Sequence, residues 1–136
     1  MDYLFELNFE VRDYELDAQS VVNNATYMNY LEHTRHAFLK AIGMDFVQLH
    51  HEGIDPMVIK SELNYKRPLR SNDLFSVKIN IERQGPLKIL FLQDIYRGDE
   101  LILEAKVWAV CVNNKSGRPI KPDAFDVHLE DYKKKV

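Results

Sequence analysis

The sequence predicts an α+β domain in which an antiparallel sheet curls around one long helix. Three patterns along the 136-residue chain predict it: apolar and polar residues alternate over 5–11, a helical period covers 27–42, and strand patterns fill 57–112. Because short turns join the later strands, neighbouring strands run antiparallel. A helix and a sheet that are each apolar on one face must bury those faces against each other.

The composition is that of an ordinary globular domain. Apolar residues make up 46% and charged residues 29% of the chain, and a chain of this length folds without a disulfide or metal staple. We expect residues 1–136 to form a single domain. One cysteine, no apolar run of membrane-spanning length and an N-terminus without a basic region favour a cytoplasmic protein with no membrane contact. The net charge of −3 predicts no nucleic-acid partner.

The first strand and the helix are predicted from their different periods. Period two over 5–11 indicates a half-buried strand. Residues 13–24, rich in Asp, Asn, Gln and Ser, indicate a loop, with or without a short turn of helix. The helical pattern then runs to Ile42, and Gly43 is typical of the position just after a helix. A helix of about 16 residues is ~24 Å long. Residues 45–52 predict a short second helix.

Strand patterns follow, and they give a sheet of about five strands in all. The four later strands are predicted over 57–67, 74–83, 87–97 and 101–112. The segment 87–97 is the most uniformly apolar, which predicts a central strand. Residues 113–119 indicate a turn-rich loop, and 122–131 a closing helix or an irregular tail. We expect the lysine-rich end, 133–135, to be mobile.

Several catalytic motifs are missing from the sequence. It contains no G-x-S-x-G, glycine-rich phosphate loop, C-x-x-C or H-E-x-x-H. His33 and His36 could share a metal at their spacing, but two solvated helix histidines fit equally well, and we expect neither a metal nor a cofactor. Cys111 lies in an apolar strand, which favours a core residue over a nucleophile. Glu32 and Arg35 are spaced to pair on the helix, which favours a structural or interface role.

The loop before the helix contains the remaining candidate chemistry. Asp13, Glu15 and Asp17 lie between a buried strand and a helix start. Free N–H groups at a helix start stabilise negative charge, and a carboxylate can act as a nucleophile or as a general base on water. These are the minimum groups for acyl transfer. A turn or capping role explains the same residue types, because Asp, Asn and Thr commonly precede helices.

A linked set of motifs resembles the 4-hydroxybenzoyl-CoA thioesterase family of hot-dog-fold proteins. The motifs are Asp17-x-x-Ser20-Val21-Val22-x-Asn24-x-x-Tyr27, Tyr30-Leu31-Glu32-x-x-Arg35, and Tyr65-x-x-Pro68 followed by Asp73. The resemblance runs from the first strand to Val112. It implies a hot-dog fold, an acyl-CoA substrate, and a homodimer with active sites at the interface, with dimers often paired into a homotetramer.

The resemblance also implies roles for single residues. Asp17 falls on the catalytic aspartate, and Tyr27 on the helix tyrosine. Asn24 and Ala25 fall at the helix start, where backbone N–H groups polarise the thioester carbonyl. Ser20 and Val22 are expected to contact substrate. Ser20 stands where the family usually has glycine, so we expect a different backbone conformation there. Asn24 stands where many members have histidine; it can form hydrogen bonds but is neither an acid nor a base.

The phosphates of CoA require cations. The candidates are Arg83 and Lys88, which flank a turn, and the Lys66 cluster, Lys66-Arg67-x-x-Arg70; Arg118 is a further candidate. The expected function is hydrolysis of an acyl-CoA thioester to a free acid and CoA. Two alternatives remain: an acyl-ACP thioesterase on the same fold, because an acidic carrier protein suits the Lys66 cluster equally well, and a protein that binds acyl-CoA without catalysis.

Overall fold

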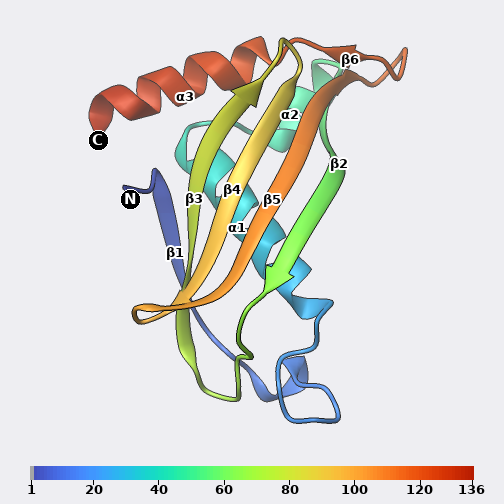
Figure 1. Cartoon of the computed structure of the whole chain (residues 1–136). Helices are drawn as coiled ribbons and strands as arrows, with labels where there is room; N and C mark the ends of the chain where they lie inside the picture. The colour runs from blue at the N-terminus through green and yellow to red at the C-terminus, as the bar shows by residue number, and fades with distance from the viewer. Residues whose placement is uncertain (1) are drawn as a thin grey trace.

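A curved antiparallel sheet forms the framework of the molecule (Figure 1). The structure is a computed structural model that describes residues 2–136. The strand order is β1-β3-β4-β5-β2, and β6 pairs with β5. The strands are β1 (Phe5–Glu10), β2 (Ile54–Tyr65), β3 (Leu74–Gln84), β4 (Lys88–Arg97), β5 (Glu100–Asn113) and β6 (Pro119–Ile120). The central position predicted for 87–97 is confirmed, since β4 lies in the middle of this order.

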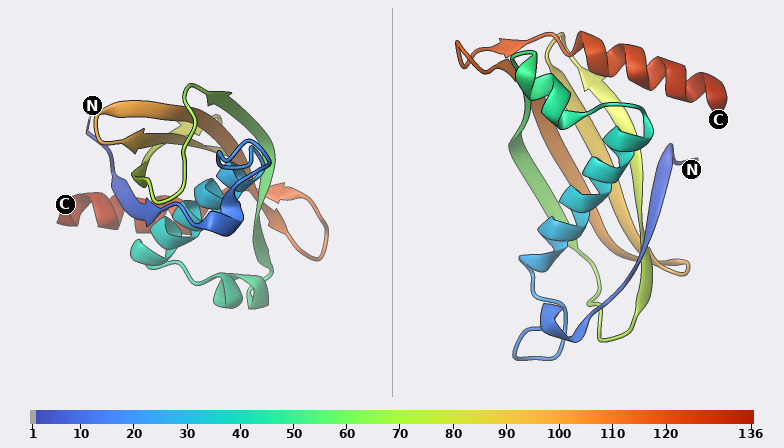
Figure 2. Two further views of the ribbon diagram at one scale, coloured as in Figure 1. Left: turned by 90° about the horizontal axis from the view of Figure 1, so that it is seen from below. Right: turned by 180° about the vertical axis from the view of Figure 1, so that it is seen from behind.

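The long helix lies across the concave face of the sheet, as the view from behind in Figure 2 shows. The α-helices are α1 (Thr26–Ala41), α2 (Phe46–His51) and α3 (Asp123–Lys135), and one turn of 3-10 helix, η1 (Asp13–Glu15), lies in the loop before α1. α1 ends just before Gly43, whose φ of +95° suits the left-handed conformation that follows many helices. Asp45 is the N-cap of α2, and its side chain accepts hydrogen bonds from the N–H groups of Val47 and Gln48. The predicted α+β hot-dog architecture is confirmed.

Two clusters of buried apolar side chains join the helix to the sheet. Leu31 and Phe38 on α1 are fully buried, and so are the sheet residues that face them, among them Val77, Leu103 and Val107. These side chains fall on one face of each element because the helical and strand periods place them there. Burying each large side chain stabilises the fold by about 1.5–3 kcal/mol, which fixes α1 and therefore the loop that precedes it.

Three local predictions differ from the structure. β2 begins at Ile54, earlier than predicted, and includes Pro56; a proline is tolerated there because β2 is an edge strand. The loop predicted over 113–119 leads into the short strand β6, which the sequence did not indicate. α3 continues to Lys135, so the lysines expected in a mobile end lie on its last turn.

The free edge of β2 is unusually apolar. Met57, Val58 and Ile59 are each about half exposed, at 53%, 47% and 51%. The register with β5 shifts between Val58 and Lys60, which leaves Ile59 in a bulge. Exposed edge strands usually have charged residues or proline to prevent pairing with another chain. The stretch 57–59 has neither, although Pro56 precedes it and Lys60 follows it, so this part of the edge is suited to contact with a second sheet.

Candidate active site

The segment that contains Asp17 forms a tight turn. The N–H of Asp17 donates to the carbonyl of Val21 (2.8 Å), and the N–H of Ser20 donates to the carbonyl of Asp17 (3.1 Å). Asp17 Oδ1 accepts from the N–H groups of Gln19 (2.8 Å) and Val21 (3.4 Å). These bonds hold the carboxylate in one orientation. Among the described residues they engage only one of its oxygens, so Oδ2 is available to a ligand.

Ser20 adopts the backbone conformation that glycine favours. Its φ is +64°, in the left-handed region, so the expectation of a different conformation at Ser20 is wrong. The surrounding turn imposes this conformation, because the hydrogen bonds of Asp17 close the turn on both sides. A side chain with a Cβ is strained in that region by roughly 1–2 kcal/mol.

Ser20→Gly is expected to raise the free energy of unfolding by about 0.5–1 kcal/mol, because relief of this strain exceeds the added entropy of the unfolded chain. Thermal or denaturant unfolding measures it. Ser20→Ala is the matched control, since alanine retains a Cβ and should give no gain. A glycine variant less stable than the alanine variant would show that Ser20 is not strained.

The start of α1 lies beside this turn. Asn23 organises it: its side-chain Oδ1 accepts from the N–H of Ala25 (2.9 Å), and its carbonyl accepts from the N–H of Thr26 (2.9 Å). The Ala25 amide predicted to polarise a thioester is therefore bonded to a side chain of its own loop. Asn23 is exposed, so its oxygen can give way to a developing oxyanion, which is the stronger acceptor.

Tyr27 anchors the helix start to the chain that leaves β2. Its hydroxyl accepts a hydrogen bond from the N–H of Leu69 (3.1 Å), and its ring packs edge-on against Tyr65 (5.5 Å between centroids). Tyr65 in turn donates to the carbonyl of Asn24 (3.1 Å). Burial raises the pKa of Tyr27, so the hydroxyl stays protonated near neutral pH. Tyr27 therefore positions the site.

Tyr27→Phe is expected to lower the free energy of unfolding by about 1–3 kcal/mol, because it leaves the buried N–H of Leu69 without an acceptor. Urea unfolding measures the change, provided that the unfolding free energy depends on urea concentration with the same slope in both proteins. The matched control is Tyr65→Phe, which removes an exposed hydroxyl and should cost less. Equal losses in the two variants would contradict this role for Tyr27.

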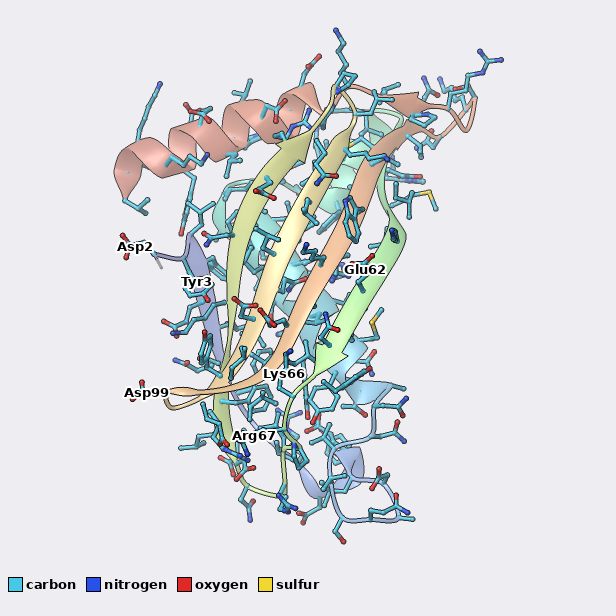
Figure 3. The ribbon with its side chains drawn as sticks, viewed as in Figure 1. Asp2, Tyr3, Glu62, Lys66, Arg67 and Asp99 are labelled. Carbon is cyan, nitrogen blue, oxygen red and sulfur yellow. The ribbon has the colours of Figure 1, made fainter. Side chains whose placement is uncertain are left out.

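The turn, the helix start and the end of β2 surround one hollow of about 410 Å³. The predicted site residues that line it are Asp17, Val22, Asn24, Tyr27, Lys66 and Arg67. Figure 3 labels Lys66 and Arg67 at the end of β2. Each pairs with a carboxylate of the β5 region, Lys66 with Glu104 (3.6 Å) and Arg67 with Glu100 (3.0 Å). Tyr65 also lines the hollow; its position directly before Lys66 in the motif was the only sequence signal for it.

Arg83 and Lys88 lie elsewhere. The turn between β3 and β4 is beside α3, at the opposite end of the sheet from the loop before α1 (Figure 1). The Arg83 guanidinium bonds Asp126 (2.9 Å) and the carbonyls of Pro86 and Lys88. Within one protomer, Arg83 and Lys88 therefore lie outside the hollow. Their contact with CoA stays a prediction.

The other carboxylates of the loop have structural partners. Glu15 Oε1 accepts from the Tyr30 hydroxyl (2.8 Å) and from the N–H of Arg12 (2.8 Å). Asp13 accepts a short hydrogen bond from the hydroxyl of Ser71. Of the three acidic residues in the loop, Asp17 is thus the one that presents a carboxylate oxygen to the hollow.

The remaining sequence candidates have packing roles. His33 packs edge-on against Phe9, and His36 packs against Phe46. Among residues 2–136, no three potential metal ligands gather into a site. Cys111 is 4% exposed, and burial raises the pKa of its thiol, so it is not a ready nucleophile. None of the helices that the structure describes has both the length and the apolar character of a membrane span.

A second, more apolar cavity lies between α1 and β2, and we call it the α1–β2 cleft. Its volume is about 310 Å³, and it is lined by Arg35, Leu39, Met57, Phe91, Cys111 and Phe125, among others. The sequence contains no direct signal for this cleft, because residues from a helix and several strands form its walls. Met57 lines the cleft and lies on the edge strand β2, so the cleft opens at the free edge of β2.

The fold and the pre-helix carboxylate define a hot-dog protein with a hollow at the start of its long helix. The chain belongs to the thioesterase-like superfamily, whose family model matches residues 11–130. The resemblance seen in the sequence is thereby confirmed at the level of the superfamily. Membership of the 4-hydroxybenzoyl-CoA branch in particular stays a prediction.

Individual relatives agree with this membership. The chain is 40% identical over 123 residues to "Acyl-acyl carrier protein thioesterase ATL3, chloroplastic" of Arabidopsis thaliana, covering 89% of this chain and 64% of the relative. The chain thus spans slightly less than two thirds of that relative. It is 26% identical over 117 residues to "Long-chain acyl-CoA thioesterase FadM" of Escherichia coli, covering 85% of this chain and 88% of the relative. A crystal structure of a hypothetical protein from Aquifex aeolicus superposes with a TM-score of 0.85 at 26% identity, covering 92% of this chain and 98% of that one.

Proposed function

We propose that the protein hydrolyses acyl-CoA thioesters to a free carboxylic acid and CoA, with Asp17 as the catalytic residue. The observation that supports this most is the free carboxylate oxygen of Asp17 in a hollow that also contains the start of α1 and two cations. Relatives named as acyl-CoA and acyl-ACP thioesterases support the same reaction class.

The chemistry needs one group to attack and one to stabilise charge. Asp17 either attacks the thioester carbonyl carbon directly or removes a proton from a water whose oxygen attacks. The carbonyl oxygen becomes negative, and N–H groups at the start of α1, including that of Ala25, stabilise it. The carbon–sulfur bond then breaks, and the CoA thiolate leaves. After direct attack, water hydrolyses the acyl-aspartate anhydride to release the acid and restore Asp17.

Two protomers are needed to complete this site in our proposal. Pairing of two β2 edges about a two-fold axis runs the strands antiparallel. The end of β2 beside Asp17, at Tyr65, then lies near the start of the partner's β2, where Met57 opens the α1–β2 cleft. The acyl group of a thioester held at Asp17 thus enters an apolar cleft of the second protomer. Pairing of dimers into a homotetramer remains a prediction.

Thiol release from a panel of acyl-CoAs tests the proposed reaction. Purified protein is incubated with acyl-CoAs of varied chain length and aromatic character, and free thiol and free acid are measured together. Equal amounts of both products, formed in proportion to protein, are expected from at least one acyl-CoA. Binding of acyl-CoA without thiol release would instead support the non-catalytic alternative.

One observation supports a second candidate substrate, an acyl group carried by acyl carrier protein instead of CoA. The plant relative at 40% identity is named an acyl-ACP thioesterase. Lys66 and Arg67 border the hollow and are about half exposed, so they can meet either a phosphate of CoA or the acidic surface of a carrier protein. Comparing kcat/KM for one acyl group on the two carriers decides between them, and Arg67→Glu should lower the value for the preferred carrier more than for the other.

A further inference from the structure

The α1–β2 cleft contains one feature that an apolar acyl pocket does not require. Arg35, from the middle of α1, lines a cavity whose walls are mostly apolar, with Glu32 and His36 of the same helix among its other charged or titratable residues. Its side chain is largely buried, with the residue only 7% exposed. A buried guanidinium is expensive to desolvate unless charged or polar partners surround it.

Within residues 2–136, Arg35 has few such partners. One guanidinium nitrogen donates to Gln93 Oε1 (3.0 Å). No carboxylate of the described chain forms a salt bridge with it: Glu32 also lines the cleft and its charge acts on the guanidinium from a distance, but the pairing suggested by their spacing does not form. A guanidinium has five N–H donors, so several remain for another acceptor. Every fully buried side-chain nitrogen of the described residues has a hydrogen-bond partner. The Arg35 nitrogens that form no hydrogen bond therefore keep some exposure, and because Arg35 lines the cleft, they border its open space.

The arginine is also held in place. Gln93 is fully buried on β4, and its Nε2 donates to the carbonyl of Leu31 (3.1 Å) on α1. This bond fixes the amide so that its oxygen faces Arg35. Burial lowers the pKa of the Arg35 guanidinium and the charge of Glu32 partly opposes this, and the group stays charged at neutral pH because an arginine starts far above that range. The cleft therefore presents a fixed cation to whatever enters it.

We infer that the α1–β2 cleft selects acyl groups that have an oxygen acceptor, such as a hydroxyl, a keto group or a carboxylate, positioned to bond Arg35. This inference rests on the proposed function, because it assigns the substrate class of the same site. The apolar walls bind the hydrocarbon part, and Arg35 replaces the water that such an oxygen would lose on burial. An unsubstituted acyl chain leaves the Arg35 guanidinium facing hydrocarbon.

The test measures affinity in a background that cannot turn over substrate. In the Asp17→Asn protein, calorimetry compares an unsubstituted acyl-CoA with hydroxy, keto and carboxy acyl-CoAs of the same chain length, substituted at several positions. At least one oxygenated acyl-CoA is expected to bind roughly 10- to 100-fold more tightly than the unsubstituted one, as for a hydrogen bond to a charged group. Which member gains most identifies the acceptor and its distance from the thioester.

Two further substitutions show whether Arg35 causes the preference. Arg35→Met should reduce the ratio to about one. Gln93→Glu should do the same by a different route, since it keeps Arg35 and supplies the guanidinium with a carboxylate inside the protein, although it loses the bond to the Leu31 carbonyl. Arg67→Met is the matched control: it removes a guanidinium near the hollow and should leave the ratio unchanged. Thermal unfolding confirms that each variant is folded.

An unsubstituted chain that binds as tightly as every oxygenated one would overturn the inference, as would a preference that survives both Arg35→Met and Gln93→Glu. Failure of the proposed hydrolysis gives a different result. In that case the wild-type protein releases no thiol, while the affinity ratio in the Asp17→Asn protein still reports on Arg35.

Discussion

Asp17→Asn is expected to lower kcat/KM for acyl-CoA hydrolysis by roughly 1,000-fold, within the range that loss of a nucleophile or general base produces. An amide neither attacks the carbonyl nor accepts a proton. The asparagine Oδ1 can still accept the hydrogen bonds of Gln19 and Val21, so the turn is retained. Thiol release measures the rate, and calorimetry with an acyl-CoA should show nearly unchanged affinity.

The matched control for this substitution is Asp13→Asn, in the same loop. Asp13 bonds Ser71 and is not part of the hollow, and an asparagine oxygen can accept the same bond. Its activity should stay within about threefold of the wild type, as expected for a surface change. Equal losses from the two substitutions would mean that charge in the loop matters and that Asp17 has no special role.

The second large effect is expected from the free edge of β2. Ile59→Lys places a charge in the bulge between Val58 and Lys60, where the edge would meet a second copy of the chain. A two-fold interface contains each substitution twice, so the dissociation constant of the dimer should rise by roughly 100-fold or more. Because the proposed site uses both protomers, activity should fall in step with the fraction of dimer, which sedimentation or light scattering measures alongside thiol release.

Leu74→Lys provides the matched control for the edge substitution. Leu74 is also apolar and is 68% exposed, but it lies at the start of β3, away from the free edge of β2. It should alter neither the oligomeric state nor the rate. An Ile59→Lys protein that is monomeric and fully active would contradict the shared site, and one that is still dimeric would place the interface elsewhere.

The fold could be predicted because its signals are local. The alternation over 5–11 and the helical period from Tyr27 each identify one element, and the uniformly apolar segment 87–97 identified the central strand β4. The ends of elements were less predictable. The second strand was predicted to begin at residue 57, but β2 begins at Ile54 and includes Pro56; the sequence does not show that β2 is an edge strand, on which a proline is tolerated.

The candidate site was predictable in part for the same reason. Asp17, Asn24 and Tyr27 are close in sequence, so one loop and one helix start bring them together. Sequence could not show that Asn23 bonds the Ala25 amide, nor that the turn holds Ser20 at a positive φ. The α1–β2 cleft was also beyond reach, because Arg35 and Gln93 are 58 positions apart and meet only when α1 packs on the sheet.

The most direct test of the central claim follows the fate of one acyl-CoA in water labelled with heavy oxygen. The wild-type protein should release thiol and free acid in equal amounts over many turnovers, with on average about one labelled oxygen per acid molecule once several turnovers have passed, and Asp17→Asn should release almost none. A first turnover whose acid lacks the label would identify Asp17 as the nucleophile, since its own oxygen is then transferred. No thiol release from any acyl-CoA by folded wild-type protein, or equal release by Asp17→Asn, would contradict the account.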